Sequence, residues 1–241
     1  MPIAMWSGPR NISTAMMRSW GARADTVVCD EPLYAHYLWK TGLDHPGAAE
    51  VIGAGETDPA KVAEILTTPR PPAAIFYQKH MAHHLLPRMD TSWVDRLTSG
   101  FLIREPREML TSLIDVIPSP EIEETGLPRQ LELFEREADR LGRTPPVIDS
   151  RDVLENPRGV LAKLCAALSV PFDEAMLSWE PGPRETDGVW AKHWYASVEK
   201  STGFGPYRRK DADVPPRLSG VLAECERLYE RLARHKLTAE G

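Results

Sequence analysis

Short apolar runs separated by longer helical patterns recur along this chain. The runs cover residues 2–6, 26–29, 73–77, 101–103 and 146–148. Runs of this length are typical of buried strands, and the intervals between them are long enough for crossover helices. The pattern therefore predicts an α/β fold with three layers, in which helices flank a central, mostly parallel β-sheet.

Helical periodicity is clearest in the second half of the chain. Apolar residues recur every three or four positions over 158–168 and again over about 216–235, where the helix follows two prolines. Two segments, 42–55 and 179–207, carry few signals of regular structure. Loops as long as the second one usually cover or bind a ligand. We expect one domain that spans residues 1–241.

Composition narrows the range of partners. The net charge of −6 argues against broad nucleic-acid binding, which needs a basic surface, but it does not exclude a small anion. Three widely spaced cysteines without a CxxC pair predict free thiols. Neither a signal peptide nor an apolar stretch of about 20 residues is visible. We expect a cytoplasmic protein without a nucleic-acid or membrane partner.

The segment after the first apolar run has the features of an anion-binding loop. Gly8 permits a tight turn, Arg10 supplies positive charge, and Ser13 and Thr14 place hydroxyl groups in the first turn of a helix. A strand, a turn and a helix in this order point backbone N–H groups and the positive helix end at an anion. The alternative is a plain helix cap provided by Asn11 or Ser13. The expected binding residues are Gly8, Pro9, Arg10, Asn11, Ile12, Ser13 and Thr14.

The loop differs from that of nucleoside triphosphate-binding proteins. Their GxxxxGK[ST] pattern would place a second glycine and a lysine where this chain has Ser13 and Thr14. The apolar run at 26–29 ends in Asp30 and Glu31, as in proteins where such an acid holds magnesium. A P-loop kinase or a nucleotide hydrolase therefore stays open as an alternative.

The segment PRNISTA at 9–15 resembles the PKSGTTW loop of the cytosolic sulfotransferases. Those enzymes bind the 5′-phosphosulfate of 3′-phosphoadenosine 5′-phosphosulfate (PAPS) with this loop. The resemblance implies a P-loop-type fold and a nucleotide site at the loop. It also implies that Arg10 stabilises the charge that develops on the sulfuryl group.

A second segment, FLIREPREMLTS at 101–112, resembles the YVARNAKDVAVSYY segment of the same family. Arg104 and Ser112 stand eight residues apart, the spacing at which the family's arginine and serine hold the 3′-phosphate. A guanidinium at a strand end and a hydroxyl two turns into the next helix can converge on one phosphate. The alternative is a structural arginine paired with Glu105 or Glu108.

Two residues are candidates for the catalytic base. QKHMAHHLLP at 78–87 resembles KTHLPLALLP, which aligns His80 with the family's histidine, although Gln78 replaces the family's lysine and Lys79 is displaced by one position. An imidazole suits proton transfer near neutral pH. Glu31 is the second candidate, because some bacterial and carbohydrate sulfotransferases use a glutamate near this point. The alternatives are a surface or capping histidine, as expected for His83 and His84, and a helix cap at Glu31.

The late segment EKSTGFG at 199–205 is the nearest counterpart of the family's RKGxxGDW loop. It adds Lys200, Ser201 and Thr202 as cofactor contacts. The family's adenine-stacking tryptophan is Ala15 here, so the stacking ring must come from elsewhere. The candidates are Trp190, Trp194 and Phe204.

Together these features predict a PAPS-dependent sulfotransferase. A hydroxyl or amine of a small-molecule acceptor would attack the sulfuryl group in line and release 3′-phosphoadenosine 5′-phosphate (PAP). Tyr34, His36 and Tyr37 are expected at the mouth of the acceptor site. Sulfuryl transfer carries less negative charge than phosphoryl transfer, so no metal is expected. A non-catalytic nucleotide-binding protein of sulfotransferase descent is a third alternative.

Overall fold

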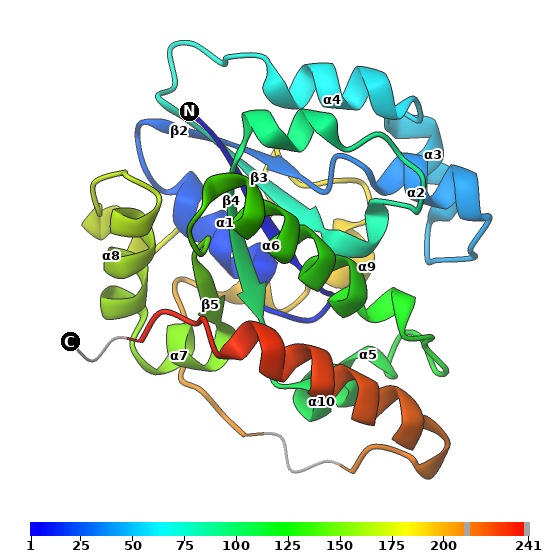
Figure 1. Cartoon of the computed structure of the whole chain (residues 1–241). Coiled ribbons are helices and arrows are strands. Elements are labelled where there is room, and N and C mark those ends of the chain that lie inside the picture. Colours follow the sequence, from blue (N-terminus) through cyan, green and yellow to red (C-terminus); the bar gives the residue numbers. More distant parts are fainter. Residues whose placement is uncertain (210–212, 239–241) are drawn as a thin grey trace.

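A five-stranded parallel sheet forms the centre of the molecule (Figure 1). The computed structural model describes residues 1–209 and 213–238. The strands follow the order β2-β3-β1-β4-β5 across the sheet. They are β1 (Pro2–Ser7), β2 (Thr26–Asp30), β3 (Ile75–Met81), β4 (Thr98–Ile103) and β5 (Val147–Asp149). All five expected strands are present, but β3 continues to Met81 rather than ending at residue 77.

Helices connect the strands and follow the last of them. They are α1 (Ser13–Gly21), α2 (Tyr34–Thr41), α3 (Ala48–Ala54), α4 (Pro59–Thr67), α5 (Pro106–Leu113), α6 (Leu127–Leu141), α7 (Ser150–Glu155), α8 (Pro157–Ala167), α9 (Ala191–Trp194) and α10 (Ser219–Ala233). Short 3₁₀ turns include η1 (Ala82–His84), η3 (Glu123–Thr125), η5 (Val198–Lys200) and η6 (Pro216–Leu218). The expected helix at 216–235 is therefore η6 followed by α10.

Each face of the sheet packs against its own set of helices. Trp6 and Phe101 point to the face that is covered by α4, α5, α6 and α10. Met5 and Tyr77 point to the other face, where α1, α7 and α8 supply the apolar side chains. Because side chains alternate along a strand, neighbouring residues of β1 enter different cores. The expected three-layer α/β fold is confirmed.

Four helices, α4, α5, α7 and α8, begin with a side chain that caps their free amides. Asp58 caps α4, Glu105 caps α5 and Asn156 caps α8 through a carboxylate or amide oxygen. Helix α1 differs, because its N-cap residue is Ile12, which cannot supply such an oxygen. The first-turn amides of α1 therefore lack a side-chain cap, and they face the site described below.

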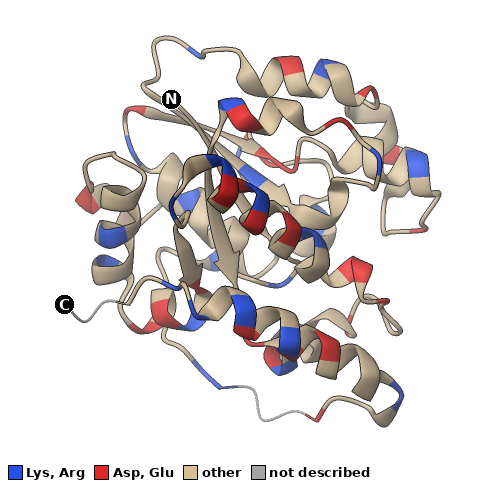
Figure 2. Ribbon diagram, viewed as in Figure 1, with Lys and Arg blue, Asp and Glu red and all other residues tan. Residues whose placement is uncertain are grey.

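Charges are mixed along the outer helices. Figure 2 shows basic and acidic positions interspersed along α6 and α10. Within the described residues, no helix is long and apolar enough to cross a membrane.

Candidate active site

A cavity of about 350 Å³ lies where the carboxyl ends of the strands meet the late segment of the chain. The loop after β1 lines it, together with Glu31 after β2, Lys79 near the end of β3 and Arg104 after β4. Residues between 190 and 205 complete the lining. This edge is where open parallel sheets usually bind their ligands.

The loop after β1 is held in an unusual backbone conformation. Arg10 has a φ of 61° and Ile12 has a φ of 56°, backbone angles that residues other than glycine seldom adopt. Gly8 lies so close to Thr125 that a Cβ would stand 2.3 Å from its carbonyl oxygen. A glycine is needed there because the loop and η3 approach each other closely.

The structure does not support the plain helix-cap alternative for the loop. No side chain caps α1, and the Asn11 amide instead donates to the Leu102 carbonyl at 3.3 Å. This bond ties the loop to β4. The cavity lining includes every expected loop residue from Pro9 to Thr14. Gly8 does not line the cavity and lies against Thr125 instead.

The expected 5′ and 3′ phosphate contacts come together at one end of the cavity. Arg10 Nε donates to Ser112 Oγ at 2.9 Å, and Arg104 Nη1 donates to the Arg10 carbonyl at 2.6 Å. Burial, and then the neighbouring charge of Arg104, lower the pKa of Arg10. Two guanidinium groups near each other in a partly buried site favour an anionic ligand.

Arg104 also has the structural role that was considered as an alternative. It forms an ion pair with Glu108 at 3.2 Å, on the helix that follows β4. Glu105 instead caps α5 by accepting from two backbone amides. The ion pair fixes the guanidinium at the cavity wall, where Arg104 remains a lining residue.

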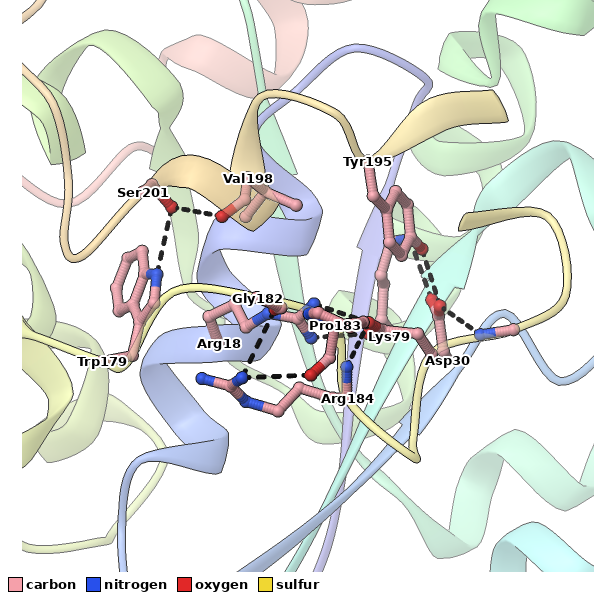
Figure 3. A network of polar contacts seen from close by, with 12 residues as sticks. Arg18, Asp30, Lys79, Trp179, Gly182, Pro183, Arg184, Tyr195, Val198 and Ser201 are labelled. Atoms are coloured by element: carbon pink, nitrogen blue, oxygen red, sulfur yellow. Dashed lines mark hydrogen bonds and ion pairs between the residues drawn. The ribbon is translucent and has the colours of Figure 1, made fainter. Parts of the chain in front are cut away.

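A buried polar network centred on Lys79 borders the same cavity, and Figure 3 shows its Lys79, Asp30 and Tyr195 side chains. Lys79 Nζ contacts Asp30 Oδ1 at 2.9 Å and Glu31 Oε1 at 2.6 Å. The Tyr195 hydroxyl donates to Asp30 Oδ2 at 2.6 Å, and the Gly188 amide donates to the same oxygen. The network therefore ties the late segment to the ends of β2 and β3.

Glu31 lines the cavity at the edge of this network. Its φ of 38° is strained for a non-glycine residue, and strain of this kind is frequent at functional positions. Burial raises the pKa of Glu31, Lys79 opposes that effect, and Asp30 adds to it. The alternative role as a side-chain cap of α2 is not observed, since that helix has no side-chain cap.

The placement of His80 corrects its expected role. Because β3 continues to Met81, alternation along the strand turns Lys79 toward the cavity and His80 toward the opposite core. His80 stacks on Trp6 at 4.2 Å between ring centroids, and Gln78 is its hydrogen-bond partner at 3.1 Å. Burial lowers the pKa of His80 to about 3. It does not line the cavity, so its geometry does not suit a catalytic base.

His83 and His84 are not the surface residues that were expected. Both line the cavity, and His84 is only 2% exposed. Tyr34 and Tyr37 also line it, in agreement with their expected place at the mouth, whereas His36 is turned away and pairs with the Thr57 carbonyl.

Of the three late residues expected to contact the cofactor, only Ser201 lines the cavity. Ser201 lines the cavity and accepts a hydrogen bond from Trp179 at 3.0 Å. Lys200, at the end of η5, and Thr202 are exposed and do not line it. All three candidates for adenine stacking border the cavity: Trp190, Trp194 and Phe204.

The fold and this cavity define an α/β protein with a strained loop and an uncapped helix start at the carboxyl edge of a parallel sheet. A family model described as "Sulfotransferase domain" matches residues 1–215. The chain belongs to this sulfotransferase family.

Two curated relatives from Arabidopsis thaliana are similar over 233 residues, which is 97% of this chain. They are named branched-chain-amino-acid aminotransferase-like proteins 1 and 2, with 35% and 33% identity. The chain spans only 42% and 41% of their lengths.

Solved structures with the same fold are more distant in sequence. The sulfotransferase domain of the curacin biosynthetic pathway aligns with a TM-score of 0.53 and 15% identity, covering 98% of both chains. The sulfotransferase domain of the Synechococcus PCC 7002 olefin synthase aligns with a TM-score of 0.58 and 18% identity, covering 95% of this chain and 94% of the other. A sulfotransferase from Alicyclobacillus acidocaldarius aligns with a TM-score of 0.58 and 12% identity, covering 98% of this chain and 96% of the other. These similarities establish the fold.

Proposed function

We propose that this chain transfers a sulfuryl group from PAPS to a hydroxyl or amine of a small-molecule acceptor. The observation that carries the proposal is the pair of guanidinium groups at the cavity wall: Arg10 donates to Ser112, and Arg104 donates to the Arg10 carbonyl. They lie beside the uncapped amides of α1. A nucleotide with phosphates at both ends of its ribose suits such a site, because it offers one anionic group to each set of donors.

The donor set suggests a role for each part of the cavity. Arg104 and Ser112 would hold the 3′-phosphate, and the loop from Gly8 to Thr14 would hold the 5′ end. When bound, PAPS supplies the activated sulfuryl group. The α1 amides and Arg10 would stabilise the negative charge that develops during transfer. Of the late residues, Ser201 keeps its place as a cofactor contact.

Glu31 is the proposed base. Its carboxylate lines the cavity, and the Lys79 ammonium favours its ionised form. The acceptor oxygen would bond to sulfur as the bond from sulfur to the 5′-phosphate oxygen breaks. The acceptor proton would pass to Glu31, and PAP would leave with the electron pair. We also keep the inferences that the protein is cytoplasmic and needs no metal.

The contacts of Asp30 weaken the kinase alternative. A magnesium-binding acid needs free carboxylate oxygens. Here Lys79 occupies one oxygen of Asp30, and the Tyr195 hydroxyl occupies the other. We do not extend the aminotransferase-like name of the curated relatives to this chain, because it describes proteins of which the chain spans less than half.

Titration calorimetry with PAP tests the proposal. Arg104→Ala should weaken PAP binding by roughly 10- to 100-fold, since it removes charge-assisted hydrogen bonds to a phosphate. Arg107→Ala is the matched control, because Arg107 lies three positions on, does not line the cavity, and pairs with the surface residue Glu226 at 3.6 Å. PAP that fails to bind the wild type, or that binds both variants equally well, would contradict the proposal.

A further inference from the structure

One wall of the cavity consists of stacked rings from α2, η1 and the late segment. We call Tyr34, Tyr37, His84 and Trp190 the aromatic wall. Tyr34 and Tyr37 each stack on His84, with ring centroids 4.8 and 4.7 Å away. Trp190 meets Tyr34 edge-on at 5.2 Å. All four residues line the cavity, so a ligand in this part lies against this stacked group of rings.

Unpaired ring nitrogens accompany this wall. His84 is 2% exposed, yet its Nδ1 has no hydrogen-bond partner, and the same holds for His83 Nδ1 and His45 Nε2. Burial lowers the pKa of His83 to about 3 and lowers that of His84 well below its usual range. These imidazoles are therefore neutral near pH 7, and each keeps one nitrogen able to accept a hydrogen bond. A donor group of a ligand in this part of the cavity could therefore bond to these nitrogens.

The charge of this part of the cavity is negative. Glu124 lines it from η3, and its charge reaches the wall, where it adds to burial in raising the pKa of Tyr37 to about 12. Glu31 and Asp30 supply two further carboxylates, whereas Lys79 supplies one ammonium that both of them share. Among the described lining residues here, Glu31 and Glu124 thus face Lys79, whose ammonium is also shared with the buried Asp30.

From these features we infer that the acceptor carries an ammonium group in addition to the hydroxyl that is sulfated. The ammonium would contact the Glu124 carboxylate and lie against the aromatic wall. It would donate to the unpaired imidazole nitrogens. The hydroxyl would reach Glu31, which takes its proton as the oxygen bonds to sulfur and PAP leaves. This inference rests on the proposed sulfotransferase function.

Three probes of nearly equal shape test the inference on the PAP-loaded protein: tyramine, 4-ethylphenol and 3-(4-hydroxyphenyl)propionate. They differ in the charge of the side chain, which is positive, neutral and negative. Calorimetry should show tyramine binding about tenfold more tightly than 4-ethylphenol, a difference typical of one favourable charge contact, with the propionate weakest. Glu124→Gln should remove most of the preference for tyramine and leave 4-ethylphenol binding unchanged.

Glu123→Gln is the matched control, because Glu123 is the exposed neighbour of Glu124 and does not line the cavity. It should keep the full preference for tyramine. Equal affinity for the three probes, binding of none, or a preference that survives Glu124→Gln would overturn the inference. The ranking on the wild type decides the matter even if Glu124→Gln folds poorly. Failure of PAP to bind appears in the first titration and counts against the proposed function instead.

Discussion

Replacing Lys79 by methionine tests whether the buried network supports the ends of β2 and β3. The side chains of Lys79, Asp30 and Glu31 are only 2%, 1% and 12% exposed. Lys79→Met removes the one ammonium that neutralises both carboxylates. Removing one partner of a buried ion pair typically costs about 3–5 kcal/mol. We expect a loss of that size in the free energy of unfolding at pH 7, measured by urea denaturation with tryptophan fluorescence.

The same variant should show a distinctive dependence on pH. Burial and Asp30 raise the pKa of Glu31, whereas Lys79 lowers it. Without the ammonium only the raising effects remain, so the pKa of Glu31 rises further. A carboxyl whose folded-state pKa is raised contributes stability at low pH and loses that contribution as pH rises. The deficit of Lys79→Met should therefore be largest at pH 7 and shrink toward pH 5.

Lys192→Met is the matched control for this experiment. Lys192 pairs with Glu50 on the surface, where both side chains are more than half exposed. Such pairs contribute little to stability, so this variant should unfold almost as the wild type does. A small loss in Lys79→Met, or a loss that stays constant between pH 7 and pH 5, would refute the reasoning.

The choice of base leads to two further predictions, both measured as transfer of labelled sulfate from PAPS to tyramine or another active acceptor. Glu31→Gln should lower kcat by about 10²- to 10⁴-fold without changing PAP affinity. His80→Phe should leave kcat nearly unchanged and cost about 1–3 kcal/mol of stability, because the buried Gln78 Oε1 loses its partner. A large loss of kcat in His80→Phe with little loss in Glu31→Gln would restore His80 as the base. The wild-type kcat should fall with decreasing pH at a midpoint above the ordinary glutamate pKa of about 4.3, since Glu31 must be ionised; a midpoint at or below that value would count against it.

Local patterns predicted the fold well. Each strand is a short apolar run with its own signal, and all five expected strands occur. Helix α3 was missed inside the segment at 42–55, because it buries only Val51 and starts at Gly47 with a φ of 75°. A short helix of this kind leaves almost no periodic pattern to detect.

The polar site was harder to predict, because its geometry depends on where one strand ends. An apolar run marks β3 only to residue 77, whereas the strand continues through the polar segment QKHM. That difference turns Lys79 toward the cavity and His80 into the core. The alternation of side chains beyond residue 77 could have revealed it had the strand end been known.

Other members of the site are distant in sequence. Tyr195 joins Asp30 across 165 positions, and His45 and Glu124 reach the same cavity from separate loops. No spacing rule connects such residues in a single sequence. Arg104 and Ser112 were found because both belong to one strand–helix unit.

Comparing PAP with ADP on the wild-type protein tests the central claim most directly. The two nucleotides are isomers with the same number of phosphates, and they differ in whether the second phosphate is on the 3′ oxygen or in a diphosphate. If Arg104 and Ser112 hold a 3′-phosphate, calorimetry should show PAP binding at least about 100-fold more tightly than ADP. Equal affinities, or tighter binding of ADP in the presence of magnesium, would contradict the assignment of this cavity to PAPS.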